Sequence, residues 1–269
     1  MKAILKIAKE LWENIQLINR LALYEIKIKN NNNYLGEAWE LITPLFFMAI
    51  YWFVFGYGIR GDNSAVDGVP YLNWMSAGIT IWFFVHSAVT QGSKAIYTKI
   101  RLVSKMNFPS SIIPVYVMIS RLYPHVMILL LVVIYMQFTE YKVSIYYLQF
   151  PYFIVSMLML ITSVLLITST LTTVIRDIQM FIQSTIRVFL YISPFLWVSD
   201  RLPDFVQDLM KLNPLYYLAE GYRAAFFGGS WYMVEHWQYT LYFWVVVLLL
   251  FSAGALLHTR FRKHFIDFL

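Results

Sequence analysis

Residues 30–61 read NNNNYLGEAWELITPLFFMAIYWFVFGYGIRG, and this stretch contains the change in character that decides the fold. A run of Asn ends one segment, a Gly-x-x-Trp turn follows, and the apolar and aromatic residues Leu41–Ile59 come next. A helix of that length can cross the roughly 30 Å hydrocarbon core of a membrane. The segment before it carries too many charges to cross. The sequence therefore predicts a chain that lies on a membrane and then enters it.

The composition of the whole chain agrees with a membrane location. Of its 269 residues, 59% are hydrophobic and 13% are charged, whereas about 25% of the residues of a soluble domain are charged. The chain has no Cys, which excludes disulfides, thiolate metal sites and a Cys nucleophile. The net charge of +6 is attributed to basic residues in the cytoplasmic loops of a membrane protein rather than to a nucleic-acid-binding surface. We expect an all-α integral membrane protein without a soluble module.

Six apolar stretches are long enough to span a membrane as helices. They are Leu41–Ile59, Tyr71–Gln91, Ile112–Phe138, Leu148–Val174, Ile178–Val198 and Trp237–Leu257. With the N-terminus inside, 14 of the 21 Lys and Arg residues lie in the inner segments and 5 in the outer ones. Because cytoplasmic loops are enriched in Lys and Arg, this bias predicts a multi-pass plasma-membrane protein with both termini in the cytoplasm.

Residues 1–33 are predicted to form an amphipathic interfacial helix, followed by a six-helix membrane domain over residues 34–269. Apolar side chains recur in the first segment at three- and four-residue spacing, namely Ile4, Ala8, Leu11, Ile15, Ile18 and Ala22. Charged side chains on the other faces make this helix too polar to span. Two interpretations stay open: a helix that borders a transport pathway and can shift, or a passive anchor.

Residues 92–108 form a basic connection between the second and third spans. Its basic residues are Lys94, Lys99, Arg101 and Lys105, and it contains no acidic residue. Ile96 and Ile100 follow helical spacing, which favours a short amphipathic helix that docks into a groove on a cytosolic partner. The alternative is that the topology bias alone placed these charges here.

Residues 203–229 are longer than a connector between spans requires. Phe205–Leu212 and Leu215–Phe227 are apolar-rich but too short to span, and Asn213-Pro214 separates them. Segments of this length predict short re-entrant helices that enter from the outer face and return. The alternative is an ordinary extracellular helical cap.

Arg187 falls near the middle of the fifth predicted span, where a charge is costly unless it has a function or a partner. Glu220 is the nearest plausible acid, and backbone carbonyls, cavity water or an anionic substrate are the alternatives. Arg121, in the third span, is expected to extend towards the cytosolic side. Aromatic residues that could line a pathway, or simply pack, are Phe47, Tyr51 and Phe55 in the first span and Phe181 and Phe189 in the fifth.

Several kinds of site are missing from the sequence. No Gly is followed by Lys, so the chain has no P-loop for ATP. His86 and His125 stand alone within spans, without the second ligand or the acid that a metal or acid–base site needs. We expect them to be hydrogen-bonded structural residues, and we expect no metal, cofactor or catalytic residue in this chain.

An ordered set of motifs resembles the ABC-2 type permease family over essentially the whole chain. The motifs are Tyr34-Leu35-Gly36-x-x-Trp39, Pro44-Leu45, Lys105-Met106-Asn107-Phe108-Pro109, and Leu212-Asn213-Pro214-Leu215 followed by Tyr222-Arg223. Within that family the chain is most similar to permease subunits of wall teichoic acid exporters. The segments NNNNYLGEAWE, YWFVFGYGIRG and SKMNFPSS carry this closer similarity.

The resemblance implies an exporter in which two permease copies pair with two separate ATP-binding cassette subunits, which bind ATP and Mg. Its cargo would be an anionic glycopolymer linked to undecaprenyl diphosphate. It implies a gate helix over Ile4–Lys29, a coupling helix over Lys94–Lys105 and an outer exit at Phe205–Phe227. The residues that it assigns are Leu11, Trp12, Ile15 and Arg20 in the gate helix and Asn213, Pro214, Glu220, Tyr222 and Arg223 at the exit.

Other functions are weighed against this one. A capsule or O-antigen polysaccharide exporter shares the same architecture. An intramembrane lipid-linked sugar transferase needs paired acids or a His–acid pair near a membrane face, and the sequence has neither there. A secondary transporter or channel would work on an ion gradient without an ATPase partner.

Overall fold

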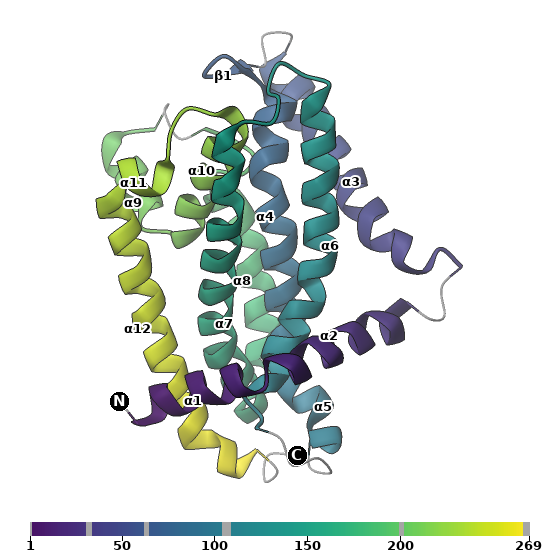
Figure 1. The fold of residues 1–269 in the computed structure, drawn as a ribbon, viewed down its shortest axis with the longest axis vertical. Coiled ribbons are helices and arrows are strands. Elements are labelled where there is room, and N and C mark those ends of the chain that lie inside the picture. Colours follow the sequence, from purple (N-terminus) through teal and green to yellow (C-terminus); the bar gives the residue numbers. More distant parts are fainter. Residues whose placement is uncertain (1, 31–33, 62–64, 104–108, 199–201, 266–269) are drawn as a thin grey trace.

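The structure is a computed structural model that describes residues 2–30, 34–61, 65–103, 109–198 and 202–265. Its centre is a bundle of long helices that run side by side (Figure 1). They are α4 (Tyr71–Gly92), α6 (Ile112–Gln137), α7 (Phe150–Val174), α8 (Ile178–Ile192) and α12 (Trp237–Phe261). One large cluster of buried apolar side chains holds these helices together. The bundle therefore forms the frame on which the remaining segments are placed.

Within the described part of the chain, four helical segments are long and apolar enough to cross a membrane. They are Gly36–Ile59, Ile112–Gln137, Ile145–Val174 and Trp237–His264. α4 lies where the second span is predicted, but it buries polar side chains such as Asn73 and Thr80 and is not among the four. The predicted count of six spans thus stays a prediction.

The fifth predicted span, Ile178–Val198, is shorter in the structure than in the sequence-based prediction. α8 ends at Ile192, and Ser193 is extended with ψ at 152°. Pro194 explains this end, because proline disfavours the helical conformation of the residue before it. The 15 residues of α8 reach about 22 Å, less than the roughly 30 Å hydrocarbon core.

The amphipathic N-terminal segment is two helices rather than one, α1 (Lys2–Glu13) and α2 (Ile15–Asn30). The chain turns at Asn14, whose Nδ2 donates to the Glu10 carbonyl at 2.8 Å. α1 contacts α12, whereas α2 lies along α6, and together they cross the lower end of the bundle in Figure 1. The two contacts require different buried faces. Ile7 and Ile18 are buried, whereas Ala8 and Ile15, predicted for one apolar face, are exposed.

The first span leaves the bundle at an angle (Figure 1). It consists of a short 3-10 turn (Gly36–Ala38), α3 (Trp39–Tyr51) and a π-helix (Trp52–Arg60). Only 11% of its most apolar stretch is buried, against 56% for the segment that contains α7. Phe46, Phe53 and Tyr57 are all more than half exposed. This span therefore presents an apolar surface that the rest of the chain does not cover.

The end of the bundle opposite α1 and α2 carries the short elements. A two-stranded antiparallel hairpin, β1 (Ala65–Val66) and β2 (Val69–Pro70), is the exception to the all-α expectation. A 3-10 turn (Ile145–Gln149) precedes α7. Three further helices, α9 (Asp204–Lys211), α10 (Pro214–Phe227) and α11 (Tyr232–Glu235), lie before α12. α5 (Ala95–Val103) and the 3-10 turn Arg262–His264 lie at the other end, with both chain termini (Figure 1).

Candidate translocation and coupling site

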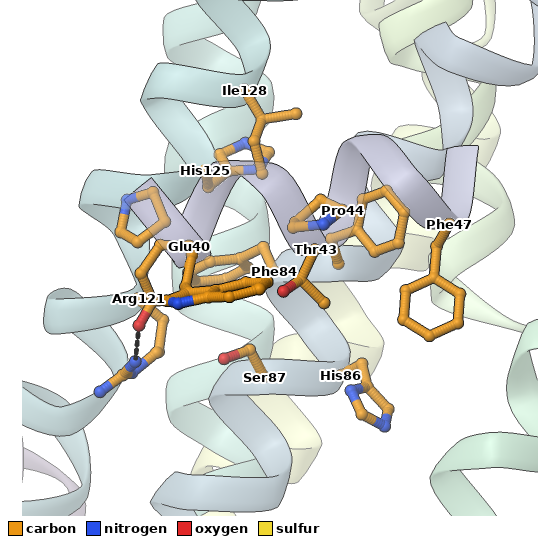
Figure 2. Close-up of a pocket in the computed structure, with 13 residues that line it drawn as sticks. Glu40, Thr43, Pro44, Phe47, Phe84, His86, Ser87, Arg121, His125 and Ile128 are labelled. Carbon is orange, nitrogen blue, oxygen red and sulfur yellow. Dashed lines mark hydrogen bonds and ion pairs between the residues drawn. The ribbon is translucent and has the colours of Figure 1, made fainter. Parts of the chain in front are cut away.

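A cavity of about 380 Å³ lies between α3, α4 and α6. Its lining mixes aromatic rings with polar groups, and Figure 2 shows Phe47, Thr43 and Ser87 around its centre. The cavity exists because α3 leans away from α4 and α6 instead of packing along them. A space with rings and hydroxyls at the edge of the bundle is suited to a ligand that combines sugar-like polarity with apolar parts.

Arg121 and Glu40 close one edge of this cavity (Figure 2). Arg121 Nη1 donates to Glu40 Oε1 at 3.2 Å, and only 2% of the arginine side chain is accessible. Glu40 thus holds the guanidinium inside the protein at the start of the first span, and the expectation that Arg121 extends towards the cytosolic side stays a prediction. This ion pair ties the start of the first span to α6.

α8 borders the same region. Phe47 and Tyr51 stack on α3 with ring centroids 6.0 Å apart. Tyr191 of α8 lies near Tyr51, and Arg187 lies near His86, which also lines the cavity. Arg187 is exposed. The face formed by α3, α4 and α8 therefore brings Phe47 and Tyr51 of the first span near Arg187 of the fifth.

Arg187 makes no ion pair with any residue that the structure describes. Glu220, the acid considered for it, binds Arg223 instead at 2.5 Å. Arg223 is three residues away on α10, whereas Arg187 lies on α8. The charge of Arg187 thus remains available to the open face of the molecule.

A second cavity, of about 370 Å³, is lined by α4, α7, α8 and α12 and by the first residues of α10. Phe181 and Phe189 belong to this cavity, and its exposed lining is apolar throughout. Phe55 lines neither cavity and packs against the main core. The aromatic residues predicted to line one pathway are therefore divided between two spaces with different chemistry.

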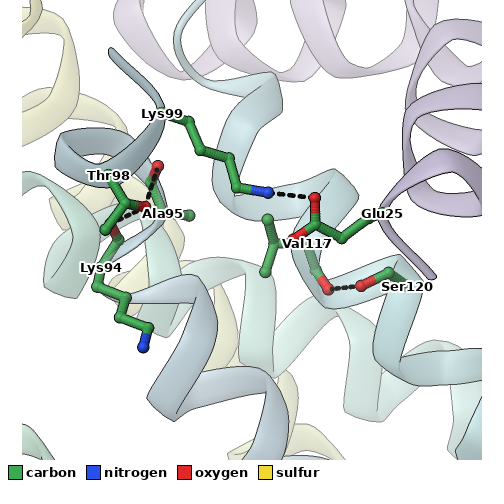
Figure 3. A network of polar contacts seen from close by, with 7 residues as sticks. All are labelled: Glu25, Lys94, Ala95, Thr98, Lys99, Val117 and Ser120. Atoms are coloured by element: carbon green, nitrogen blue, oxygen red, sulfur yellow. Dashed lines mark hydrogen bonds and ion pairs between the residues drawn. The ribbon is translucent and has the colours of Figure 1, made fainter. Parts of the chain in front are cut away.

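α5 is attached to the bundle and to α2. Ile96 is fully buried, so it holds α5 to the protein and is not free to enter a groove on a partner, as its place on a docking stripe had suggested. Lys99 forms an ion pair with Glu25 of α2, and Lys94 is partly buried (Figure 3). The side chains of Ile100 and Arg101 and all of Lys105 lie outside the described residues.

The residues assigned to the gate helix point mostly away from the bundle. Leu11 is partly buried, but Trp12 is 82% exposed and Ile15 is 50% exposed. Arg20 is exposed as well. An exposed Trp on an amphipathic helix is typical of the membrane interface, where the ring is apolar and its N–H is wet.

The predicted exit segment contains a helix with defined caps at both ends. Asn213 caps α10 by accepting from Leu215 N at 3.0 Å, and Pro214 occupies the first turn, where its missing N–H costs nothing. Gly228, with φ at 69°, ends the helix in the left-handed conformation. α9 and α10 are thus the two short helices that the sequence predicts, although a re-entrant path within a membrane stays a prediction.

Arg223 and Tyr222 connect α10 to the bundle. The Arg223 guanidinium lies 3.5 Å from the centroid of the Trp74 ring and also donates to the Pro194 carbonyl. Tyr222 is within 3.0 Å of His125 Nε2, and His125 Nδ1 is 3.2 Å from the Thr80 carbonyl. The prediction that His125 is a hydrogen-bonded structural residue is confirmed.

The described residues contain no group of three or more His, Asp and Glu that could hold a metal ion. A family model of the ABC-2 type transporter matches residues 16–227. The chain belongs to the ABC-2 type transporter family. This ABC-2 transporter chain is accordingly a multi-pass membrane protein, and the family match runs from α2 to the end of α10. The family resemblance inferred from the motifs is therefore confirmed.

Curated relatives of this ABC-2 transporter chain are O-antigen export system permease proteins named RfbA. One from Klebsiella pneumoniae is 24% identical over 248 residues, covering 91% of this chain and 92% of the relative. A second from the same organism is 23% identical over 246 residues, with the same coverage. One from Myxococcus xanthus is 24% identical over 226 residues, covering 83% and 85%.

The sequence reasoning missed Glu25 and Glu40 as partners of Lys99 and Arg121. Both acids lie outside the predicted spans, where charged residues are common and therefore do not indicate a buried partner. A usable signal existed for Glu40, since it lies one residue before an apolar span and a carboxylate there needs a partner once it is buried. Glu25 has no comparable signal.

Proposed function

We propose that this chain is the permease subunit of an ATP-driven exporter that moves a lipid-linked polysaccharide of the O-antigen type across the plasma membrane. The observation that carries the proposal is the match to relatives named O-antigen export permeases over nine-tenths of both chains. ATP hydrolysis would take place in a separate subunit, as the absence of a Gly-Lys pair in this sequence also suggests.

Wall teichoic acid remains the alternative cargo, because the closer sequence similarity noted above pointed to it. The names of the relatives favour the O-antigen reading over the teichoic acid reading. Both cargoes combine a polyprenyl chain, a diphosphate and a sugar-containing polymer. The proposed cargo is therefore a lipid-linked polymer in either case, and the experiment below distinguishes the two polymers.

The surface of the molecule supports a pathway completed by a second copy. The first span and α8 present large exposed apolar residues, and Arg187 lies exposed among them. Uncovered apolar surface of this kind suits either lipid or another protein chain. Two copies facing each other through α3 and α8 would enclose the aromatic rings of both copies, and two ATP-binding subunits would bind below them.

The proposed orientation puts both termini and α5 on the cytoplasmic side. These parts lie at the same end of the bundle (Figure 1). The same end carries the basic residues Lys94 and Lys99, as the positive-inside rule requires of cytoplasmic loops. α5 would then lie on the side of the membrane where an ATP-binding subunit binds.

The test is reconstitution of the chain with its ATP-binding subunit in liposomes. We expect ATP-dependent translocation of an undecaprenyl-diphosphate-linked O-antigen polysaccharide and stimulation of ATPase activity by that cargo. A subunit pair in which the ATP-binding partner cannot hydrolyse ATP is the control. Preference for a lipid-linked glycerol-phosphate polymer would restore the teichoic acid reading. Transport by the isolated chain on an ion gradient, or bond-forming chemistry, would refute the proposal.

A further inference from the structure

Four charged residues from four helices form a row at the inner end of the bundle. Glu25 of α2 pairs with Lys99 of α5, and Arg121 of α6 pairs with Glu40 of α3. Figure 3 shows Lys99 and Glu25 reaching towards each other beside α6. Lys99 Nζ also lies 5.0 Å from the centroid of the Tyr116 ring on α6. The row therefore joins the helix proposed to dock on the ATPase to the first span.

Arg121 is incompletely bonded in this arrangement. Its Nε and Nη2 atoms are buried and make no hydrogen bond with any residue that the structure describes. Buried donors of a charged group are rarely left without an acceptor, and each such case needs an explanation. The guanidinium has five N–H groups in a planar fork, so a second carboxylate could be accommodated beside Glu40.

Glu25 is the acid in position to supply that second carboxylate. It lies on α2, which packs along α6, and Figure 3 shows its side chain beside Val117 and Ser120, in the turn of α6 that precedes Arg121. In the present arrangement the carboxylate is held by Lys99 on the side of α5. A rotation of the Glu25 side chain, with α2 staying on α6, would turn it from the lysine to the arginine.

The geometry points to a partner exchange: when α5 moves, Glu25 leaves Lys99 and binds the free N–H groups of Arg121. This inference rests on the proposed function, in which ATP binding or hydrolysis in the partner moves α5. In one state α2 is tied to α5, and in the other it is tied to α6. Arg121 also binds Glu40, so the exchange would change the strength of the ion pair that holds the first span to α6. Glu25, Lys99 and Arg121 are then positioning residues for coupling.

A charge swap separates this exchange from a merely structural ion pair. Glu25→Lys combined with Lys99→Glu restores the attraction between α2 and α5 but places a cation beside Arg121. If the pair only holds the helices together, the swap rescues the loss caused by Glu25→Gln. If the exchange operates, cargo-stimulated ATPase activity stays at least about fivefold below wild type in both variants, the lower end of usual coupling effects.

The ion pair of Glu10 with Arg262 provides a matched control. It joins α1 to the C-terminal end of α12 at 2.8 Å, with 14% and 20% of the two side chains accessible. The Lys99–Glu25 pair is similarly covered, at 19% and 22%. Glu10→Gln removes a comparable pair that does not touch α5, so we expect its cargo-stimulated ATPase activity to stay within about twofold of wild type.

A cross-linking measurement follows the separation of α2 and α5, and the chain has no Cys of its own to interfere. Glu25→Cys and Lys99→Cys together should be bridged readily by a short bis-maleimide cross-linker in the nucleotide-free complex and several-fold less with a trapped ATP-bound partner. Equal cross-linking in both states, or full rescue by the charge swap, would overturn the exchange. A wild-type complex whose ATPase ignores the cargo would instead overturn the proposed function, and the exchange with it.

Discussion

Arg223 provides the sharpest test of how α10 is held to the bundle. Its side chain is 4% accessible, donates to Glu220 at 2.5 Å and to the Pro194 carbonyl, and lies over the Trp74 ring. Gly78 makes room for it, since a Cβ there would lie 2.8 Å from Arg223 Nη2. Replacing Arg223 by Met removes the charge and both hydrogen bonds while filling similar volume.

The size of the effect follows from these contacts. Breaking a buried ion pair costs about 3–5 kcal/mol, and a desolvated cation–π contact contributes about 2 kcal/mol. The Glu220 side chain is 30% accessible, so water replaces part of the lost pairing. Met also recovers some apolar packing. We therefore expect Arg223→Met to lower the free energy of unfolding by about 3 kcal/mol, which corresponds to a fall in Tm of about 6–12 °C.

The assay is thermal unfolding of the detergent-purified chain, followed by tryptophan fluorescence at a fixed scan rate. Arg187→Met is the matched control, because Arg187 is exposed and makes no ion pair among the described residues; its Tm should stay within about 2 °C of wild type. Arg223→Lys keeps the charge but not the planar fork, so its Tm should fall in between. Equal Tm values for the two Met variants would show that the Arg223 contacts contribute no net stability.

Three further predictions concern packing, coupling and transport. Gly221→Ala places a Cβ 2.2 Å from a ring carbon of α7 and should cost about 1–3 kcal/mol in the same thermal assay, whereas Gly229→Ala, with open space around it, should not. Charge reversal at Lys99 and Arg101 together should abolish cargo-stimulated ATPase activity in the complex while membrane insertion, measured by fractionation, is unchanged; normal stimulation would exclude docking through α5. Arg187→Ala should lower polymer export more than it lowers membrane insertion. Export at the wild-type level would show that Arg187 has no part in transport.

Helix positions were largely readable from the sequence. α4 and α6 begin at Tyr71 and Ile112, where the second and third spans are predicted to begin, because long apolar runs bounded by polar residues are local signals. The pair of short helices around Asn213-Pro214 was also readable, since an Asn cap and a Pro in the first turn act within a few residues. The end of α8 was missed because the apolar pattern continues past Pro194 although the helix does not.

The sequence by itself determined the class of the protein: its apolar content, the lengths of its apolar runs and the bias of its basic residues require a helical membrane protein. Only the tertiary structure decided that α1 and α2 are separate helices, that the first span leans away from the bundle, and which charges meet. Glu25 and Lys99 are 74 residues apart, and Glu40 and Arg121 are 81 apart. Hydrophobicity and capping act between neighbours along the chain, whereas ion pairing depends on which helices pack together, and packing is a property of the whole fold.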